Sequence, residues 1–123
     1  MVAGNVNHRG EAILNLVVQN QHGASQAVEA VVDTGFNGWL TLPVAVISDL
    51  HLPRRNSGYA TLADGIEVPI ETYEATLLWD GSPLQIMVVA SDSDPLVGMG
   101  LLYGYQLSIE VIAGGNVTAR KLA

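Results

Sequence analysis

The apolar residues of this chain occur in short runs that are separated by polar loops containing glycine. Two such runs, EAILNLVVQ at 11–19 and QAVEAVVD at 26–33, are joined by the segment NQHGAS. Runs of β-favouring residues on either side of a glycine-containing loop are typical of a β-hairpin. The pattern therefore predicts two antiparallel strands, and the second strand carries Asp33 at its end.

The following segments continue this alternation of strands and turns. WLTL at 39–42 predicts a short strand, and the apolar spacing of PVAVISDLHL at 43–52 predicts a short helix with Pro43 near its first position. The alternating segment 57–79 contains the turn sequence ADG at 63–65, so we expect a long hairpin there.

The last third of the chain predicts further strands at 83–90, after Asp80-Gly81, and at 106–112, before a Gly114-Gly115 turn and a final short strand. Residues before 11 are expected to form a tail. We find no linker between these elements. The sequence therefore predicts one all-β domain over 1–123, with its core at about 11–121 and with one or two short helices.

Composition narrows the class of protein. Of the 123 residues, 49% are apolar and 14% are charged, which is typical of a globular domain. The net charge of −7 opposes binding to a phosphate backbone, so we expect no nucleic-acid partner. The chain has no cysteine, which excludes disulfides and a thiol nucleophile and favours a cytoplasmic location. We also expect no signal peptide and no membrane partner, because no long apolar segment is present.

The candidate chemistry is concentrated in Val31-Val32-Asp33-Thr34-Gly35. A strand held by its valines leaves little freedom at its end, so the Asp33 carboxylate is aimed in a fixed direction. Gly35 allows a turn and a close approach of backbone, and Thr34 offers a hydroxyl for hydrogen bonding. The competing interpretation is an ordinary turn, in which aspartate, threonine and glycine are all common.

A second motif favours the catalytic interpretation. The DTG segment resembles the active-site loop of aspartic proteases, and Leu96-Val97-Gly98 resembles their second signature of two apolar residues and a glycine. With Leu101-Leu102 and the ADG hairpin, the order of motifs is similar to that of the single-domain, retropepsin-like aspartic proteases over most of 11–112. The resemblance implies a closed acid-protease barrel.

The resemblance also implies roles for these residues. Asp33 is the expected catalytic residue, and the expected active-site support residues are Thr34, Gly35, Leu96, Val97 and Gly98. Hydrolysis by an acid pair needs two carboxylates, and the chain has one DTG, so the second must come from a homodimer. Two such groups about 3 Å apart share one proton, an effect for which aspartic proteases are the standard example. We therefore expect an endopeptidase that acts on peptide substrates, without cofactor or metal, at acidic to mildly acidic pH.

The hairpin at about 57–71 corresponds in position to the mobile β-arm, or flap, that covers the substrate cleft in this family. Its expected tip and substrate-binding residues are Leu62, Ala63, Asp64 and Gly65. An ordinary surface hairpin would have the same turn sequence. Tyr59, near the base, is a further candidate for the cleft.

Two positions depart from the viral pattern. Viral members usually place an aspartate two residues after the DTG glycine and an arginine after the second signature, whereas this chain has Asn37 and Met99. Loss of both members of a buried charged pair can be nearly neutral for stability, whereas loss of one leaves the other charge unpaired. The sequence therefore favours a divergent, bacterial-type branch.

Two other functions remain open from sequence alone: a non-catalytic dimerisation or peptide-binding module with the same fold, and a β-barrel that binds a small apolar ligand. The histidines and serines add no alternative chemistry. His8, His22 and His51 lack metal-ligand spacing, and no serine lies in a G-x-S-x-G segment.

Overall fold

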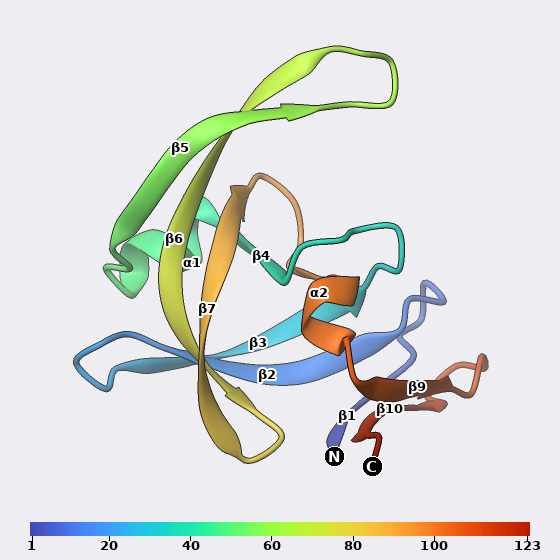
Figure 1. Cartoon of the computed structure of the whole chain (residues 1–123). Helices are drawn as coiled ribbons and strands as arrows, with labels where there is room; N and C mark the ends of the chain where they lie inside the picture. Colours follow the sequence, from blue (N-terminus) through green and yellow to red (C-terminus); the bar gives the residue numbers. More distant parts are fainter.

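The computed structural model describes residues 1–123 and consists almost entirely of strands and turns (Figure 1). In chain order the elements are β1 (Val2–Asn5), β2 (Ile13–Gln19), β3 (Ser25–Val32), β4 (Leu40–Pro43), α1 (Val44–Asp49), β5 (Arg54–Thr61), β6 (Glu67–Trp79), β7 (Ser82–Ser91), β8 (Leu96–Val97), α2 (Met99–Leu102), β9 (Tyr105–Ile109) and β10 (Asn116–Lys121). The all-β prediction with two short helices is confirmed. Neither helix is long and apolar enough to cross a membrane.

The larger sheet closes on itself. Its strand order is β2-β3-β8-β4-β7-β6-β5, and an additional pairing of β2 with β6 completes a ring. The ring confirms the predicted barrel. Its interior is filled by fully buried side chains, among them Leu14, Leu40, Leu42, Leu77 and Val88. This packed interior argues against a barrel that holds a small apolar ligand inside.

A smaller sheet of order β1-β10-β9 packs beside the barrel. The N-terminal residues, for which the sequence predicted a tail, form strand β1, and Val2 and Val6 belong to the hydrophobic core. β1 crosses β2 so closely that a Cβ on Gly4 would lie 1.9 Å from the Ile13 carbonyl oxygen. Packing of the core therefore begins at Val2, and His8 lies in the turn that follows β1.

The predicted hairpins form with the turns that their sequences indicate. β2 and β3 are joined through Gly23, whose φ is +86°, and β5 and β6 are joined through Gly65, whose φ is +85°. Asp80 and Gly81 both have positive φ, at +54° and +82°, as a two-residue type I′ turn between β6 and β7 requires.

The two helices are short, and only the first was placed by the sequence. α1 begins immediately after Pro43 and buries Ile47 against the barrel. α2 forms in the glycine-rich segment before β9 and buries Leu101 and Leu102. The strand expected at 106–112 ends at Ile109, after which the chain turns toward β10.

Candidate functional site

Asp33 stands at the end of β3, where the backbone is held on both sides. On one side the Val32 N–H donates to the Ala12 carbonyl at 2.8 Å. On the other side the Asp33 N–H donates to the Val97 carbonyl at 2.9 Å, and the Val31 N–H donates to the Pro95 carbonyl at 2.8 Å. The main chain that carries the carboxylate is therefore fixed by neighbours from two distant segments.

Strand β8 brings the second motif beside the first. Leu96 and Val97 lie between β3 and β4, parallel to the former and antiparallel to the latter. The Leu96 N–H also donates to the Thr41 hydroxyl at 2.9 Å, across 55 positions of sequence. The DTG loop and the second signature, which the sequence only ordered along the chain, are thus adjacent in space.

Gly98 lies against the loop that follows Asp33, and no larger residue fits there. A Cβ on Gly98 would lie 2.2 Å from the Gly38 carbonyl oxygen and 2.6 Å from the Phe36 ring. Three backbone hydrogen bonds join the segment 98–100 to the loop after Asp33. The N–H groups of Gly98, Met99 and Gly100 donate to the carbonyls of Trp39 at 3.0 Å, Phe36 at 2.7 Å and Gly38 at 3.0 Å, respectively.

The sequence did not identify Phe36, Gly38, Trp39 or Gly100 as site residues, although all four take part in this contact. Gly100 resembles Gly98, because a Cβ there would lie 2.5 Å from the Trp39 side chain. The repeated glycines of Gly98-Met99-Gly100 were the available signal, since two glycines with one residue between them permit close backbone approach.

The Asp33 side chain is half-buried, and Thr34 and Gly35 are exposed beside it. One carboxylate oxygen, Oδ1, accepts a hydrogen bond from the Gly35 N–H at 2.9 Å, and the Asp33 carbonyl accepts one from the Phe36 N–H at 3.1 Å. These bonds orient the carboxylate by its own loop. The second carboxylate oxygen and the Thr34 hydroxyl form no hydrogen bond within the chain.

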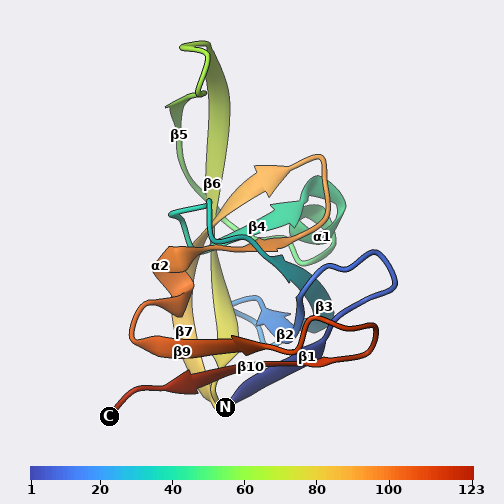
Figure 2. The same cartoon turned by 90° about the vertical axis from the view of Figure 1, so that its right-hand side faces the viewer.

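The hairpin of β5 and β6 projects from the barrel as a two-stranded ribbon (Figures 1 and 2). β6 pairs with β7 only from Thr72 onward, whereas its residues 67–71 pair with β5 alone. The predicted tip residues 62–65 do form the turn at the far end, with the Gly65 N–H donating to the Leu62 carbonyl at 2.9 Å. A two-stranded ribbon without a third strand has fewer stabilising contacts than the closed barrel.

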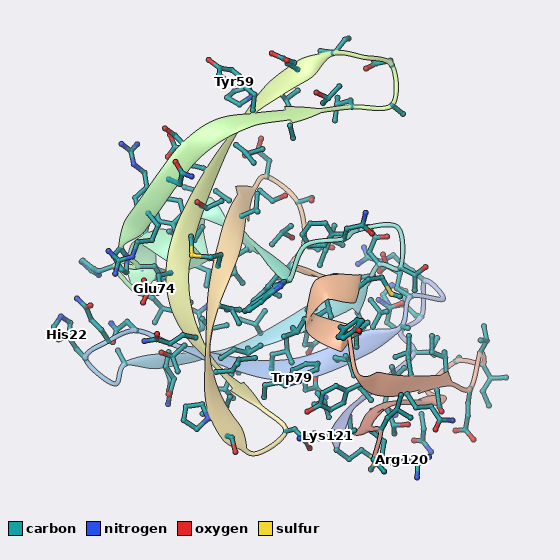
Figure 3. All side chains as sticks on the ribbon, in the orientation of Figure 1. His22, Tyr59, Glu74, Trp79, Arg120 and Lys121 are labelled. Atoms are coloured by element: carbon teal, nitrogen blue, oxygen red, sulfur yellow. The ribbon has the colours of Figure 1, made fainter.

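Charged residues join the two strands at the base of the hairpin. Arg54 forms an ion pair with Glu71 at 3.3 Å, and the Tyr73 hydroxyl donates to the same carboxylate at 3.2 Å. Burial, and then the hydrogen bond to Glu71, raise the pKa of Tyr73 above its usual value. A second ion pair joins Arg55 to Glu74, which Figure 3 shows at this base, well below Tyr59 in the projecting part. Tyr59 is 72% exposed.

No protein-family model matches the sequence, and no curated protein matches it. Solved structures do match. EIAV protease, complexed with the inhibitor HBY-793, superimposes with a TM-score of 0.53 at 17% identity, over 78% of this chain and 88% of that chain. The solution structure of simian foamy virus (mac) protease gives 0.48 at 20% identity, over 68% and 86%.

The likeness to EIAV protease, together with the closed sheet and the β8 insertion, defines the class of fold. The chain has the fold of the retropepsin-like aspartic proteases, with the DTG segment at the end of β3. At 17% identity this likeness establishes the architecture.

Proposed function

We propose that the chain is an aspartic endopeptidase that works as a homodimer and cleaves extended peptides. The observation that carries this proposal is the placement of Asp33. Its backbone is fixed between β2 and β8, its Oδ1 is oriented by Gly35, and its second oxygen points to no partner in the same chain. Such a carboxylate is prepared for chemistry, but it is only half of an acid pair.

The pair performs both proton transfers of the reaction. One Asp33, ionised, accepts a proton from a water molecule, whose oxygen attacks the carbonyl carbon of the scissile bond. The partner's Asp33, protonated, donates its proton to the carbonyl oxygen. The tetrahedral intermediate then collapses as a proton passes to the amide nitrogen, which leaves as an amine. Thr34, Gly35 and the support residues Leu96, Val97 and Gly98 keep the two carboxylates in place.

The hairpin of β5 and β6 is the proposed flap, with Leu62, Ala63, Asp64 and Gly65 at its tip. The Leu62 N–H donates to the Ile66 carbonyl at 2.8 Å, so the even-numbered residues of β5 bond to β6. The backbone groups of Ser57, Tyr59 and Thr61 therefore point away from β6. An extended peptide pairs with such an open strand edge through main-chain hydrogen bonds.

Asn37 and Met99 support assignment to the bacterial-type branch rather than the viral one. The Met99 N–H bonds to the Phe36 carbonyl, which places position 99 beside the backbone that leads to Asn37. This chain has neither of the two charges that viral members usually carry at these positions. We therefore expect substrate preference to differ from that of the viral enzymes.

Replacement of Asp33 tests the proposal. Digestion of a peptide library at pH 4 to 7 should yield cleavage by the wild type and none by Asp33→Asn, with the dimer mass unchanged. Asp49→Asn removes an exposed carboxylate on α1 and is the matched control, which should cleave normally. Cleavage that survives in Asp33→Asn would overturn the catalytic assignment. A folded dimer that cleaves nothing would favour the alternative, a non-catalytic dimerisation or peptide-binding module.

A further inference from the structure

An open cavity of about 280 Å³ lies outside the barrel, between the β6–β7 hairpin, α2 and the small sheet, and Asp33 does not line it. Its walls come from distant parts of the chain, and six of its eight lining residues are hydrophobic. Two of them, Trp79 and Lys121, are labelled in Figure 3, near the end of β6 and the end of β10. The cavity is separate from the packed interior of the barrel.

The inner wall of the cavity is fixed by packing. Trp79 and Leu101 are only 6% and 4% exposed. The rings of Trp79 and Tyr105 meet edge to face, with their centroids 5.3 Å apart. The Tyr105 hydroxyl donates to the Asp80 carboxylate at 3.2 Å, which orients the tyrosine ring. The cavity is therefore formed before any ligand arrives, as most small-molecule sites are.

The outer wall carries large apolar side chains that the rest of the chain does not cover. Tyr103 is 88% exposed, Trp39 40% and Leu84 37%. Trp39 lies directly against α2, because a Cβ on Gly100 would lie 2.5 Å from its Cδ1 atom. An apolar ring or chain placed in the cavity would remove these side chains from water, which favours binding.

One charged residue lines the cavity, and it is Lys121. Its side chain is exposed and takes part in none of the ion pairs of the chain. Hydrogen bonds from the N-terminal ammonium and from Tyr105, and then the charge of Lys121, lower the pKa of Asp80, so this carboxylate is already held by its own neighbours. The Lys121 ammonium therefore remains available to an anion at the edge of an apolar cavity.

We propose that this cavity binds a small carboxylic acid that carries an apolar ring or chain. The apolar part lies between Trp39, Trp79 and Leu84, and the carboxylate accepts a hydrogen bond from the Lys121 ammonium. The volume of about 280 Å³ lies just below the range of about 300–1,000 Å³ that is typical of small-molecule sites, so the ligand is a compact one. A neutral ligand would leave the ammonium unpaired, and a cationic one would be repelled by it. This site does not depend on the proposed peptidase function.

Tryptophan fluorescence reports on this cavity alone, because the two tryptophans of the chain both line it. The probes are cyclohexylacetate and its neutral analogue cyclohexylacetamide, neither of which absorbs where tryptophan does. Cyclohexylacetate should change the emission of the folded chain in a saturable way. The amide should bind about fivefold more weakly, because it has no charge to pair with Lys121. Equal dissociation constants for the two probes, or no saturable change with cyclohexylacetate, would overturn the proposal.

Replacement of Lys121 tests the polar half of the site. Lys121→Gln should weaken the binding of cyclohexylacetate about fivefold and leave that of the amide unchanged, whereas Lys121→Arg should retain the preference for the acid. The matched control is Arg120→Gln. Arg120 is the neighbouring exposed cation, donates to Gln106 Oε1 at 2.7 Å and does not line the cavity. Equal losses in Lys121→Gln and Arg120→Gln would refute the assignment, because the probe would then respond only to net charge.

Replacement of Leu84 tests the apolar half. Leu84→Glu puts a carboxylate into the wall of the cavity, where it removes apolar surface and repels the ligand's carboxylate, so binding of cyclohexylacetate should be lost. Gln85→Glu changes the net charge equally on the next residue of β7, which does not line this cavity, and should bind normally. Unchanged binding by Leu84→Glu would contradict the proposed site.

A dilution series without any probe tests the competing occupant, a second copy of the chain. The tryptophan emission of the wild type should not depend on protein concentration, because the cavity is open to solvent in the absence of ligand. An emission spectrum that shifts as the protein is concentrated would show that another copy covers Trp39 and would overturn the assignment to a small carboxylic acid.

Discussion

Replacement of Gly98 by alanine tests the contact that holds the Asp33 loop against β8. The added Cβ would lie 2.2 Å from the Gly38 carbonyl oxygen and 2.8 Å from the Phe36 carbonyl oxygen, far inside normal contact distance. Both atoms belong to backbone, so no flexible side chain can move aside. The φ of Gly98 is −101°, which alanine adopts without strain, so the cost comes from the steric clash.

The magnitude follows from the neighbours that must shift. Forcing an extra carbon into a packed site costs about 1–3 kcal/mol. Displacing the loop also weakens the hydrogen bonds from Gly98 to Trp39 and from Met99 to Phe36, at about 1 kcal/mol each. Alanine also reduces the conformational entropy of the unfolded chain, which offsets about 0.4–1 kcal/mol of this destabilisation. We therefore expect the free energy of unfolding to fall by about 2–4 kcal/mol.

Urea denaturation at one fixed protein concentration measures this change, because the stability of the proposed dimer would depend on concentration. Gly58→Ala is the matched control, since a Cβ added there would meet no atom within 4 Å and Gly58 lies in β5, away from the Asp33 loop. It should change the free energy of unfolding by less than about 1 kcal/mol. If Gly98→Ala is as stable as Gly58→Ala, the close packing between β8 and the Asp33 loop is not what holds the site.

Two further predictions concern titrating groups. The hydrogen bond from Asn7, and then the charge of Arg9, lower the pKa of Glu11. The ionised carboxylate therefore stabilises the fold at pH values above its ordinary pKa of 4.5, and this stabilisation is lost as the pH falls through the lower pKa of the folded state. Glu11→Gln should destabilise the protein at pH 7, and this loss should shrink as the pH is lowered below 4.5, in urea titrations at several pH values; a loss that does not change with pH would contradict this account. Because Glu71 contributes to the raised pKa of Tyr73, Glu71→Gln should lower that pKa toward 10.0, as followed by ultraviolet absorbance, with burial keeping part of the shift. No change in the titration would show that Glu71 does not affect the Tyr73 hydroxyl.

The parts of the fold that sequence predicted are those encoded locally. The strand that ends at Val32 and the hairpin turn at Gly65 each follow from apolar alternation and turn residues within a few positions. The closed barrel was expected from a family resemblance, because the β2 to β6 pairing joins residues such as Val17 and Leu78 that no local pattern connects.

The features that sequence did not predict depend on distant neighbours. β1 is only four residues long, and its partner in the sheet lies at the other end of the chain, with Val2 opposite Ala119. α2 is a single turn that forms where Gly98 and Gly100 allow close packing. For the site, the sequence identified Asp33 and the second motif, but the contact through Phe36 and Trp39 required the fold.

The insertion of β8 between β3 and β4 has a consequence for folding kinetics. The hydrogen bond from Leu96 to Thr41 closes a loop across 55 positions, and the bond from Asp33 to Val97 closes a still longer one. Contacts of such separation form late, because the entropy of loop closure must be overcome before they contribute any energy. The hairpins can form early, but the backbone that carries Asp33 is not held on both sides until β8 is inserted. Recovery of the proposed proteolytic activity during refolding should therefore coincide with the slowest structural phase.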